Sequence, residues 1–119
     1  MSNAARSVAV FGVYLCVVGL SFFFIPNTLL PPLGFAPTTE VWIRLVGLVT
    51  AILGMYFLYA VRFDDRVFFR ATIISRLIFP AGVTGLVASG LGKPILLAFA
   101  LIDLAGAAWT WLALREPVR

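Results

Sequence analysis

Two ionisable residues, Arg76 and Asp103, interrupt long apolar segments near their centres. A charged side chain at the centre of a bilayer costs about 2.5 to 3.5 kcal/mol on insertion scales, so it is usually paired or lines a polar cavity. Ionisable residues within membrane spans often mark substrate, ion or proton pathways. These two residues are therefore the first candidates for chemistry, provided that they reach the same depth in the membrane.

Their depths follow from their positions in the two segments. Arg76 lies ten residues into the segment 67–91, about 15 Å along a helix that rises about 1.5 Å per residue. Asp103 lies nine residues into the segment 95–114, about 13 Å from the opposite side of a hydrocarbon core about 30 Å thick. The matched depths predict contact between the two side chains, with the Thr72 hydroxyl one turn before Arg76 as a further polar group.

The Arg76–Asp103 pair allows two interpretations. A buried ion pair can act as a structural clasp, which specifies the helix pairing while adding little net stability. Alternatively, the pair is a polar centre that binds an anion, a lipid headgroup or the polar end of an apolar molecule.

Glu40 and Arg44 form a second candidate position. They are four residues apart and can form an ion pair on one helix face. The Arg44 guanidinium can also reach outward to the membrane interface as an anchor. The alternative is that these two residues form the outer mouth of a cavity beside the Pro-rich segment that precedes them.

The composition predicts the helices that position these residues. Of the 119 residues, 62% are hydrophobic and 12% are charged, and the apolar residues form long blocks separated by charges, Pro and Gly. Blocks of about 20 apolar residues are typical of transmembrane helices. The sequence therefore predicts an all-α integral membrane bundle, a single domain over residues 1–119. Because the links between blocks are short, its four transmembrane helices are expected to be antiparallel, over about 7–25, 41–61, 67–91 and 95–114.

The segment 26–39 joins the first two predicted helices. Its four prolines disfavour regular structure, while its leucines keep it apolar. We expect it to lie in the membrane interface, and a re-entrant segment is the alternative. Thr38 or Thr39 is expected to cap the second helix. Glu40 would then lie in the first turn, near the positive end of the helix dipole.

The distribution of basic residues predicts the orientation. Four spans place the N-terminus, the 62–66 link and the C-terminus on one side of the membrane. Six basic residues belong to that side and two to the other: Arg6, Arg62, Arg66, Arg70, Arg115 and Arg119 against Arg44 and Lys93. The positive-inside rule then predicts an inner-membrane protein with both termini in the cytoplasm.

Small residues recur at helical spacing in three of the predicted helices. They are Gly12, Cys16 and Gly19 in the first, Gly47, Ala51 and Gly54 in the second, and Gly82, Gly85 and Ser89 in the third. Small side chains let helix backbones approach closely in membranes. The spacing predicts close packing and leaves open whether the partner helix belongs to the same chain or to another copy.

The sequence lacks the residues that several classes of function need. The sequence has no His and one Cys, so no metal site built from Cys and His is expected, and no cofactor is predicted. The basic residues lie at the ends of apolar segments instead of forming a basic surface, which argues against nucleic-acid binding. Because no nucleophile with a base and no paired catalytic carboxylates are found, no catalytic residue is predicted and a non-enzymatic role is favoured.

The chain resembles small bacterial membrane proteins of the DoxX-like, mostly uncharacterised kind. The resemblance lies in the four short spans, the Pro-rich first external loop and the sequence Trp42-Ile43-Arg44-Leu45-Val46-Gly47. The stretch Phe68-Phe69-Arg70-Ala71-Thr72, followed by Ser75-Arg76, adds to it. The resemblance covers most of the chain. It implies a four-helix membrane fold with an accessory role, and it transfers no catalytic residue.

These features together predict a non-enzymatic accessory subunit or a binder of a lipid-like molecule, with Arg76 and Asp103 as its polar centre. The expected partners are membrane lipid, a hydrophobic small molecule, a further copy of the chain or another membrane protein. The alternative is an oligomeric proton-coupled transporter or channel in which Asp103 titrates.

Overall fold

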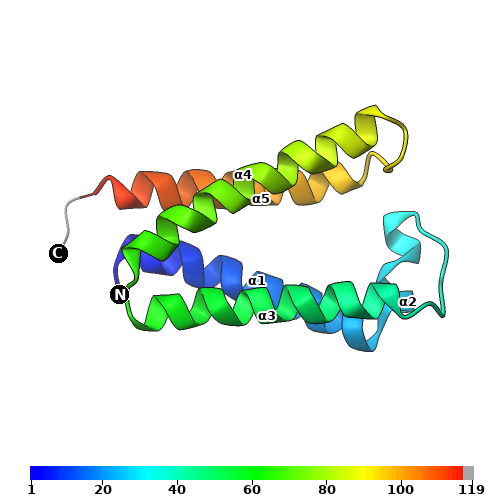
Figure 1. The fold of residues 1–119 in the computed structure, drawn as a ribbon, viewed down its shortest axis with the longest axis horizontal. Helices are drawn as coiled ribbons and strands as arrows, with labels where there is room; N and C mark the ends of the chain where they lie inside the picture. Colours follow the sequence, from blue (N-terminus) through cyan, green and yellow to red (C-terminus); the bar gives the residue numbers. More distant parts are fainter. Residues whose placement is uncertain (117–119) are drawn as a thin grey trace. The chain divides into compact units, whose positions relative to one another are not determined.

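The long helices predicted from the sequence are present in the structure. The computed structural model describes residues 1–116, and within this range the chain is helical with no strands. Its long helices are α1 (Asn3–Phe24), α3 (Trp42–Arg62), α4 (Arg66–Ala88) and α5 (Leu96–Leu114) (Figure 1). Each of them is long and apolar enough to cross a membrane. The predicted all-α class is therefore confirmed, with four candidate transmembrane helices consistent with a four-helix bundle.

The helix boundaries differ by a few residues from the predicted ones. α1 begins at Asn3 instead of residue 7, because the Ser2 hydroxyl accepts a hydrogen bond from the amide of Ala5 and caps the helix there. α4 ends at Ala88 instead of residue 91, shortly before Gly90, whose φ of 82° is left-handed. Hydropathy alone detects neither signal, because one is a capping hydrogen bond and the other is a backbone conformation.

The chain divides into two compact units. One comprises Met1–Val8 and the chain from Ala60 onward, and we call it the α4–α5 unit. The other comprises Ala9–Tyr59, and we call it the α1–α3 unit. The single domain predicted for residues 1–119 stays a prediction.

In the α1–α3 unit, the predicted small residues bring two helix backbones into contact. A Cβ atom added to Gly47 would lie 2.5 Å from the carbonyl oxygen of Gly19 and 2.7 Å from the amide nitrogen of Phe23. A Cβ atom added to Gly54 would lie 2.7 Å from the carbonyl oxygen of Gly12. The small residues of α1 and α3 therefore pack against each other within one chain.

The glycines of α4 differ from those of α1 and α3. A Cβ atom added to Gly82 or Gly85 would have no described atom within 4 Å, and Ser89 is exposed. The close packing predicted for this third stripe is therefore absent among residues 1–116.

The segment between α1 and α3 is more regular than predicted. Pro26 begins a short helix, α2 (Pro26–Leu29), and Pro31 begins one 3-10 turn, η1 (Pro31–Leu33). Proline is favoured at the first position of a helix, because the N–H that it lacks has no partner there in any case. The prediction that the prolines break regular structure is wrong for Pro26 and Pro31, which begin helical turns, whereas residues 35–40, with Pro37, form no helix or strand.

Asn27 holds the later part of this segment. Its Nδ2 donates to the carbonyl oxygen of Thr38 at 3.0 Å, and its Oδ1 accepts from the Thr38 amide at 2.8 Å. The Thr38 hydroxyl accepts from the amide of Glu40, so it stabilises a turn before the helix. α3 begins only at Trp42 and has no acidic residue in its first turn. The prediction that places Glu40 in that first turn is therefore wrong.

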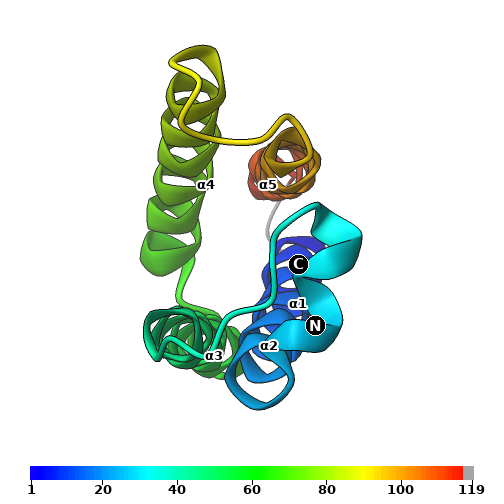
Figure 2. The same cartoon turned by 90° about the vertical axis from the view of Figure 1, so that its right-hand side faces the viewer.

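In the α4–α5 unit, α4 and α5 run in opposite directions (Figure 1) and pack against each other, with α5 seen end-on beside α4 in Figure 2. Asp65 caps α4 by accepting a hydrogen bond from the amide of Phe68 at 3.0 Å, and α4 continues through Pro80. The buried residues follow one another at spacings of three and four: Phe69, Thr72, Arg76, Pro80 and Val83 on α4, and Ala100, Asp103, Ala107, Thr110 and Ala113 on α5. Both candidate ionisable residues thus lie on the buried faces of this helix pair.

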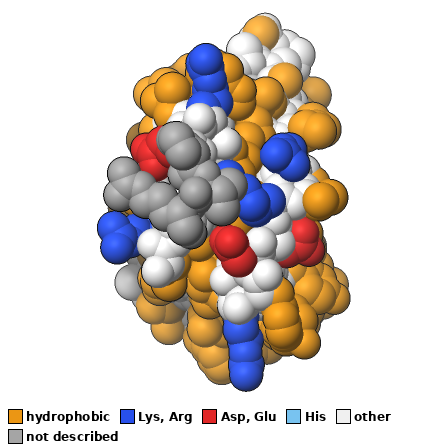
Figure 3. Space-filling model, turned by 90° about the vertical axis from the view of Figure 1, so that its left-hand side faces the viewer, with side chains coloured by type: hydrophobic (Ala, Val, Ile, Leu, Met, Phe, Trp, Pro, Cys, Tyr) orange, Lys and Arg blue, Asp and Glu red, His pale blue; other side chains and the backbone are white. Residues whose placement is uncertain are grey.

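Both ends of the described chain lie at the same end of the α4–α5 unit. Ser2 Oγ donates to Asp64 Oδ1 at 3.4 Å, and Asn3 Nδ2 donates to Glu116 Oε1 at 3.2 Å. Charged side chains gather at this end of the protein (Figure 3). The start of α1, the turn between α3 and α4 and the end of α5 therefore meet, as an even number of membrane crossings requires. Arg119, one of the six residues in the predicted basic set, lies outside the described residues.

Candidate functional site

Arg76 is the largest of the fully buried side chains and is 1% exposed. Its Nε donates to the carbonyl oxygen of Thr72 at 3.1 Å. Its Nη2 donates to the hydroxyls of Thr72 and Thr110, each at 2.8 Å. Two threonines therefore use three of the five N–H groups of the guanidinium. Because one threonine belongs to α4 and the other to α5, Arg76 fastens the two helices together.

The hydrogen bonds continue from Thr110 to the start of α1. Ser7 Oγ lies 2.7 Å from Thr110 Oγ1 and donates to the carbonyl oxygen of Ala4, also at 2.7 Å. Because the single Ser7 hydroxyl proton goes to Ala4, Thr110 is the donor between the two hydroxyls. The bonds thus run from Arg76 through Thr110 and Ser7 to a backbone carbonyl. We call Arg76, Thr72, Thr110 and Ser7 the arginine–hydroxyl network.

Asp103 lies beside this network but is not hydrogen-bonded to it. It is 9% exposed, and its charge interacts with that of Arg76. Among residues 1–116, no group donates a hydrogen bond to its carboxylate. Arg76, Thr72 and Asp103 are all buried. A charge interaction takes the place of the side-chain contact predicted between Arg76 and Asp103.

The difference has a geometric reason. Side chains on an α-helix lean toward the start of the helix. Arg76 extends toward Thr72 and Thr110. Because α4 and α5 are antiparallel, the general lean of side chains on α5 is in the opposite direction. Equal depth along two helices describes the Cα positions and not the ends of the side chains. Residues at equal depth on antiparallel helices therefore diverge at their side-chain ends.

Thr110 and Ser7 belong to the site but are not among the predicted residues. They are 0% and 1% exposed. Thr110 follows Asp103 by seven residues, which is two helical turns, so this spacing could have placed it on the same face of α5. Ser7 could not be found in this way, because its partner is 103 positions away and the contact depends on tertiary packing.

Glu40 and Arg44, the second candidate position, form no ion pair within the described residues. Arg44 Nη1 donates to the carbonyl oxygens of Phe23 and Phe24 at the end of α1. The last carbonyls of a helix lack partners within it, and a cation there also complements the helix dipole. Glu40 and Arg44 are both exposed. This contact gives Arg44 a structural role at the end of α1.

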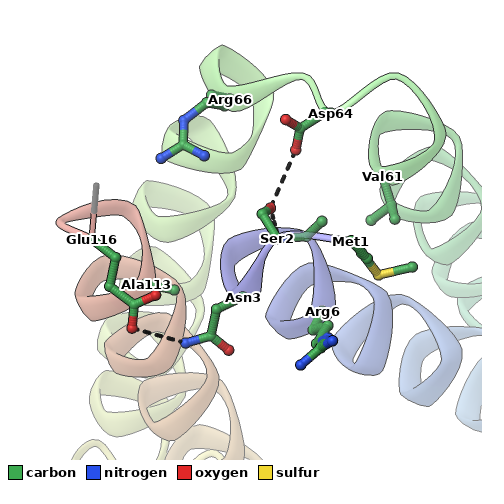
Figure 4. Close-up of a pocket in the computed structure, with 10 residues that line it drawn as sticks. Met1, Ser2, Asn3, Arg6, Val61, Asp64, Arg66, Ala113 and Glu116 are labelled. Carbon is green, nitrogen blue, oxygen red and sulfur yellow. Dashed lines mark hydrogen bonds between the residues drawn. The ribbon is translucent and has the colours of Figure 1, made fainter. Parts of the chain in front are cut away.

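A cavity of about 670 Å³ lies where the chain ends meet in the α4–α5 unit (Figure 4). Its charged lining residues are Arg6, Asp64, Arg66 and Glu116. Three of them already have partners, since Asp64 and Glu116 accept the bonds from Ser2 and Asn3, and Arg66 Nη2 donates to the carbonyl oxygen of Leu114 at 3.4 Å. The cavity could not be predicted from sequence, because its lining comes from segments far apart in the chain.

The four long apolar helices indicate a multi-pass membrane protein. Comparison with protein-family models, with curated proteins and with solved structures finds no match for this chain. Within residues 1–116, no group of three or more His, Cys, Asp and Glu side chains could hold a metal ion. The interpretation of the site therefore depends on its own geometry.

Proposed function

We propose that this chain is a non-enzymatic membrane protein that binds a lipid-like or other hydrophobic small molecule at the polar centre of Arg76 and Asp103. The observation that carries the proposal is the state of Asp103, which is 9% exposed and accepts no hydrogen bond from residues 1–116. A buried charge stabilises a fold only when hydrogen bonds compensate its desolvation. Three N–H groups of Arg76 are compensated by its threonines, whereas the Asp103 carboxylate accepts no hydrogen bond from the described residues. A binding role accounts for Asp103 better than the clasp does.

Two forms of this function are compatible with the site. The protein binds its molecule alone, or it does so as an accessory subunit beside another membrane protein or a further copy of itself. The resemblance to DoxX-like proteins supports the accessory form. We further propose that the chain resides in a bacterial inner membrane.

The proposal is tested by measuring which small molecules remain bound to the purified protein. We expect native mass spectrometry after purification in a mild detergent to show one apolar molecule retained per chain. Asp103→Leu should lose this molecule, whereas Glu40→Gln, which alters an exposed acid outside α3, should retain it. The proposal would be contradicted if Asp103→Leu retained as much of the apolar molecule as the wild type, or if the wild type retained none.

A second candidate function is an oligomeric proton-coupled transporter or channel. The same observation on Asp103 favours it, because an acid without hydrogen-bond donors inside a membrane can take up and release a proton during a cycle. Proteoliposomes with an imposed proton gradient distinguish the two. Proton flux that disappears in Asp103→Asn would favour transport, and the absence of flux would favour binding alone.

The proposed orientation makes a separate prediction. Reporters fused at Met1, at Asp64 and after Glu116 should all show a cytoplasmic location, and one fused at Gly34 should show a periplasmic location. The reason is the six-to-two distribution of basic residues between the two sides. Alkaline phosphatase and green fluorescent protein fusions provide the measurement. A periplasmic signal at Asp64 would show that the orientation is inverted or that the spans are wrongly assigned.

A further inference from the structure

The polar centre has two parts that differ in their hydrogen bonding. Arg76 is engaged with Thr72 and Thr110, and the hydroxyl protons of Thr110 and Ser7 both have acceptors. The Thr72 hydroxyl likewise donates to the carbonyl oxygen of Phe69 at 2.7 Å. The carboxylate of Asp103, by contrast, has acceptor positions that no described residue uses. Asp103 is therefore the group of the polar centre that can accept a hydrogen bond from a ligand.

No described residue donates a hydrogen bond to Asp103. The buried residues of α4 that follow Arg76 are Pro80 and Val83. Neither side chain is polar, and proline has no backbone N–H. The buried neighbours of Asp103 along its own helix are Ala100 and Ala107, which are small and apolar. The missing donor must therefore come from a bound molecule or from water.

The charge of Arg76 limits the nature of that molecule. The two opposite charges interact, so together they are close to neutral. A bound cation or anion would leave one uncompensated charge in a low-dielectric region, which is costly. An uncharged molecule avoids this cost and can still supply the donor that the carboxylate needs. A hydroxyl group on an apolar chain or ring has this chemistry.

We infer that Asp103 accepts a hydrogen bond from the hydroxyl of an uncharged apolar alcohol, and that Arg76 is a structural residue that fixes the site and balances its charge. This inference rests on the proposed binding function and names the class of ligand. The arginine–hydroxyl network holds the start of α1, α4 and α5 together, while Asp103 provides recognition.

The inference is tested with four probes that share one alkyl chain: hexadecanol, hexadecyl methyl ether, hexadecanoate and hexadecylamine. The ether lacks the donor, and the last two carry opposite charges. Binding to the purified full chain in detergent micelles is measured by native mass spectrometry at equal probe fractions. We expect hexadecanol to bind at least about tenfold more tightly than its ether, as a hydrogen bond to a charged acceptor requires. It should also bind more tightly than either ion.

The variant Asp103→Leu removes the acceptor, so the alcohol and the ether should bind to it equally. If this variant does not fold, the alcohol–ether ratio of the wild-type protein decides alone. Equal binding of alcohol and ether to the wild type, or a preference for hexadecanoate that Arg76→Lys weakens, would overturn the inference while leaving the binding function intact. Binding of none of the probes, with no apolar molecule retained on purification, would overturn both.

Discussion

Replacing Gly47 with alanine is expected to destabilise the α1–α3 unit by about 1 to 3 kcal/mol, the usual cost of overpacking. The added methyl group would lie 2.5 Å from the Gly19 carbonyl oxygen and 2.7 Å from the Phe23 amide nitrogen. Both are backbone atoms, so no side chain can rotate away and the two helices must separate. Packing of this kind drives helix association in membranes, where burial of apolar surface contributes little. Reversible unfolding by sodium dodecyl sulfate in mixed micelles, followed by circular dichroism, measures the loss.

The chain contains a matched control for this substitution. Gly85 also lies inside a long helix, and an added Cβ atom there would have no described atom within 4 Å. Alanine is the better helix former, by about 0.8 to 1.0 kcal/mol in water. Gly85→Ala should therefore be neutral or slightly stabilising. A loss as large as that of Gly47→Ala would show that contact between α1 and α3 is not the cause.

These two glycines also show how far the sequence determines the fold. The length and apolarity of each block suffice to predict the four long helices. In a membrane, the backbone N–H and C=O groups of a span must be hydrogen-bonded to one another, and a helix achieves this. The glycine stripes predict close packing on α1, α3 and α4 alike. Only tertiary structure distinguishes the stripes in contact from the one on α4. The spacing shows which residues share one face of a helix, but it does not show which helix packs against that face.

The limits of prediction are similar at the candidate site. Arg76 and Asp103 were identifiable because charge in an apolar segment is costly, and Thr72 because it lies one turn from Arg76. Helix polarity decides the direction in which each side chain extends, and the depth of a residue along its span does not reveal that direction. Ser7 depends on where the start of α1 packs. The sequence therefore predicts the polar centre, whereas the division between Arg76 and Asp103 requires the structure.

Arg76→Leu is expected to destabilise the α4–α5 unit by about 3 to 5 kcal/mol, the usual cost of removing one partner from a buried charged network. The substitution removes the donors to Thr72 and Thr110 and the charge that balances Asp103. Thr110→Val removes one link of the same network and should cost about 1 to 3 kcal/mol. Thr110→Ser keeps the hydroxyl and should remain close to the wild type. The same unfolding measurement in mixed micelles applies to all these variants.

The double variant Arg76→Leu/Asp103→Leu separates the charge interaction from the hydrogen bonds. It leaves no buried ion, so part of the loss should be recovered relative to Arg76→Leu alone. The recovery should be incomplete, because Thr72 and Thr110 still lack their donor. Arg76→Leu and Thr110→Val should be non-additive in the same way, since they act on one hydrogen bond. Full recovery in the Arg76/Asp103 double variant would make the charge interaction the main role of Arg76, and strictly additive losses in both pairs would exclude the network described for this site.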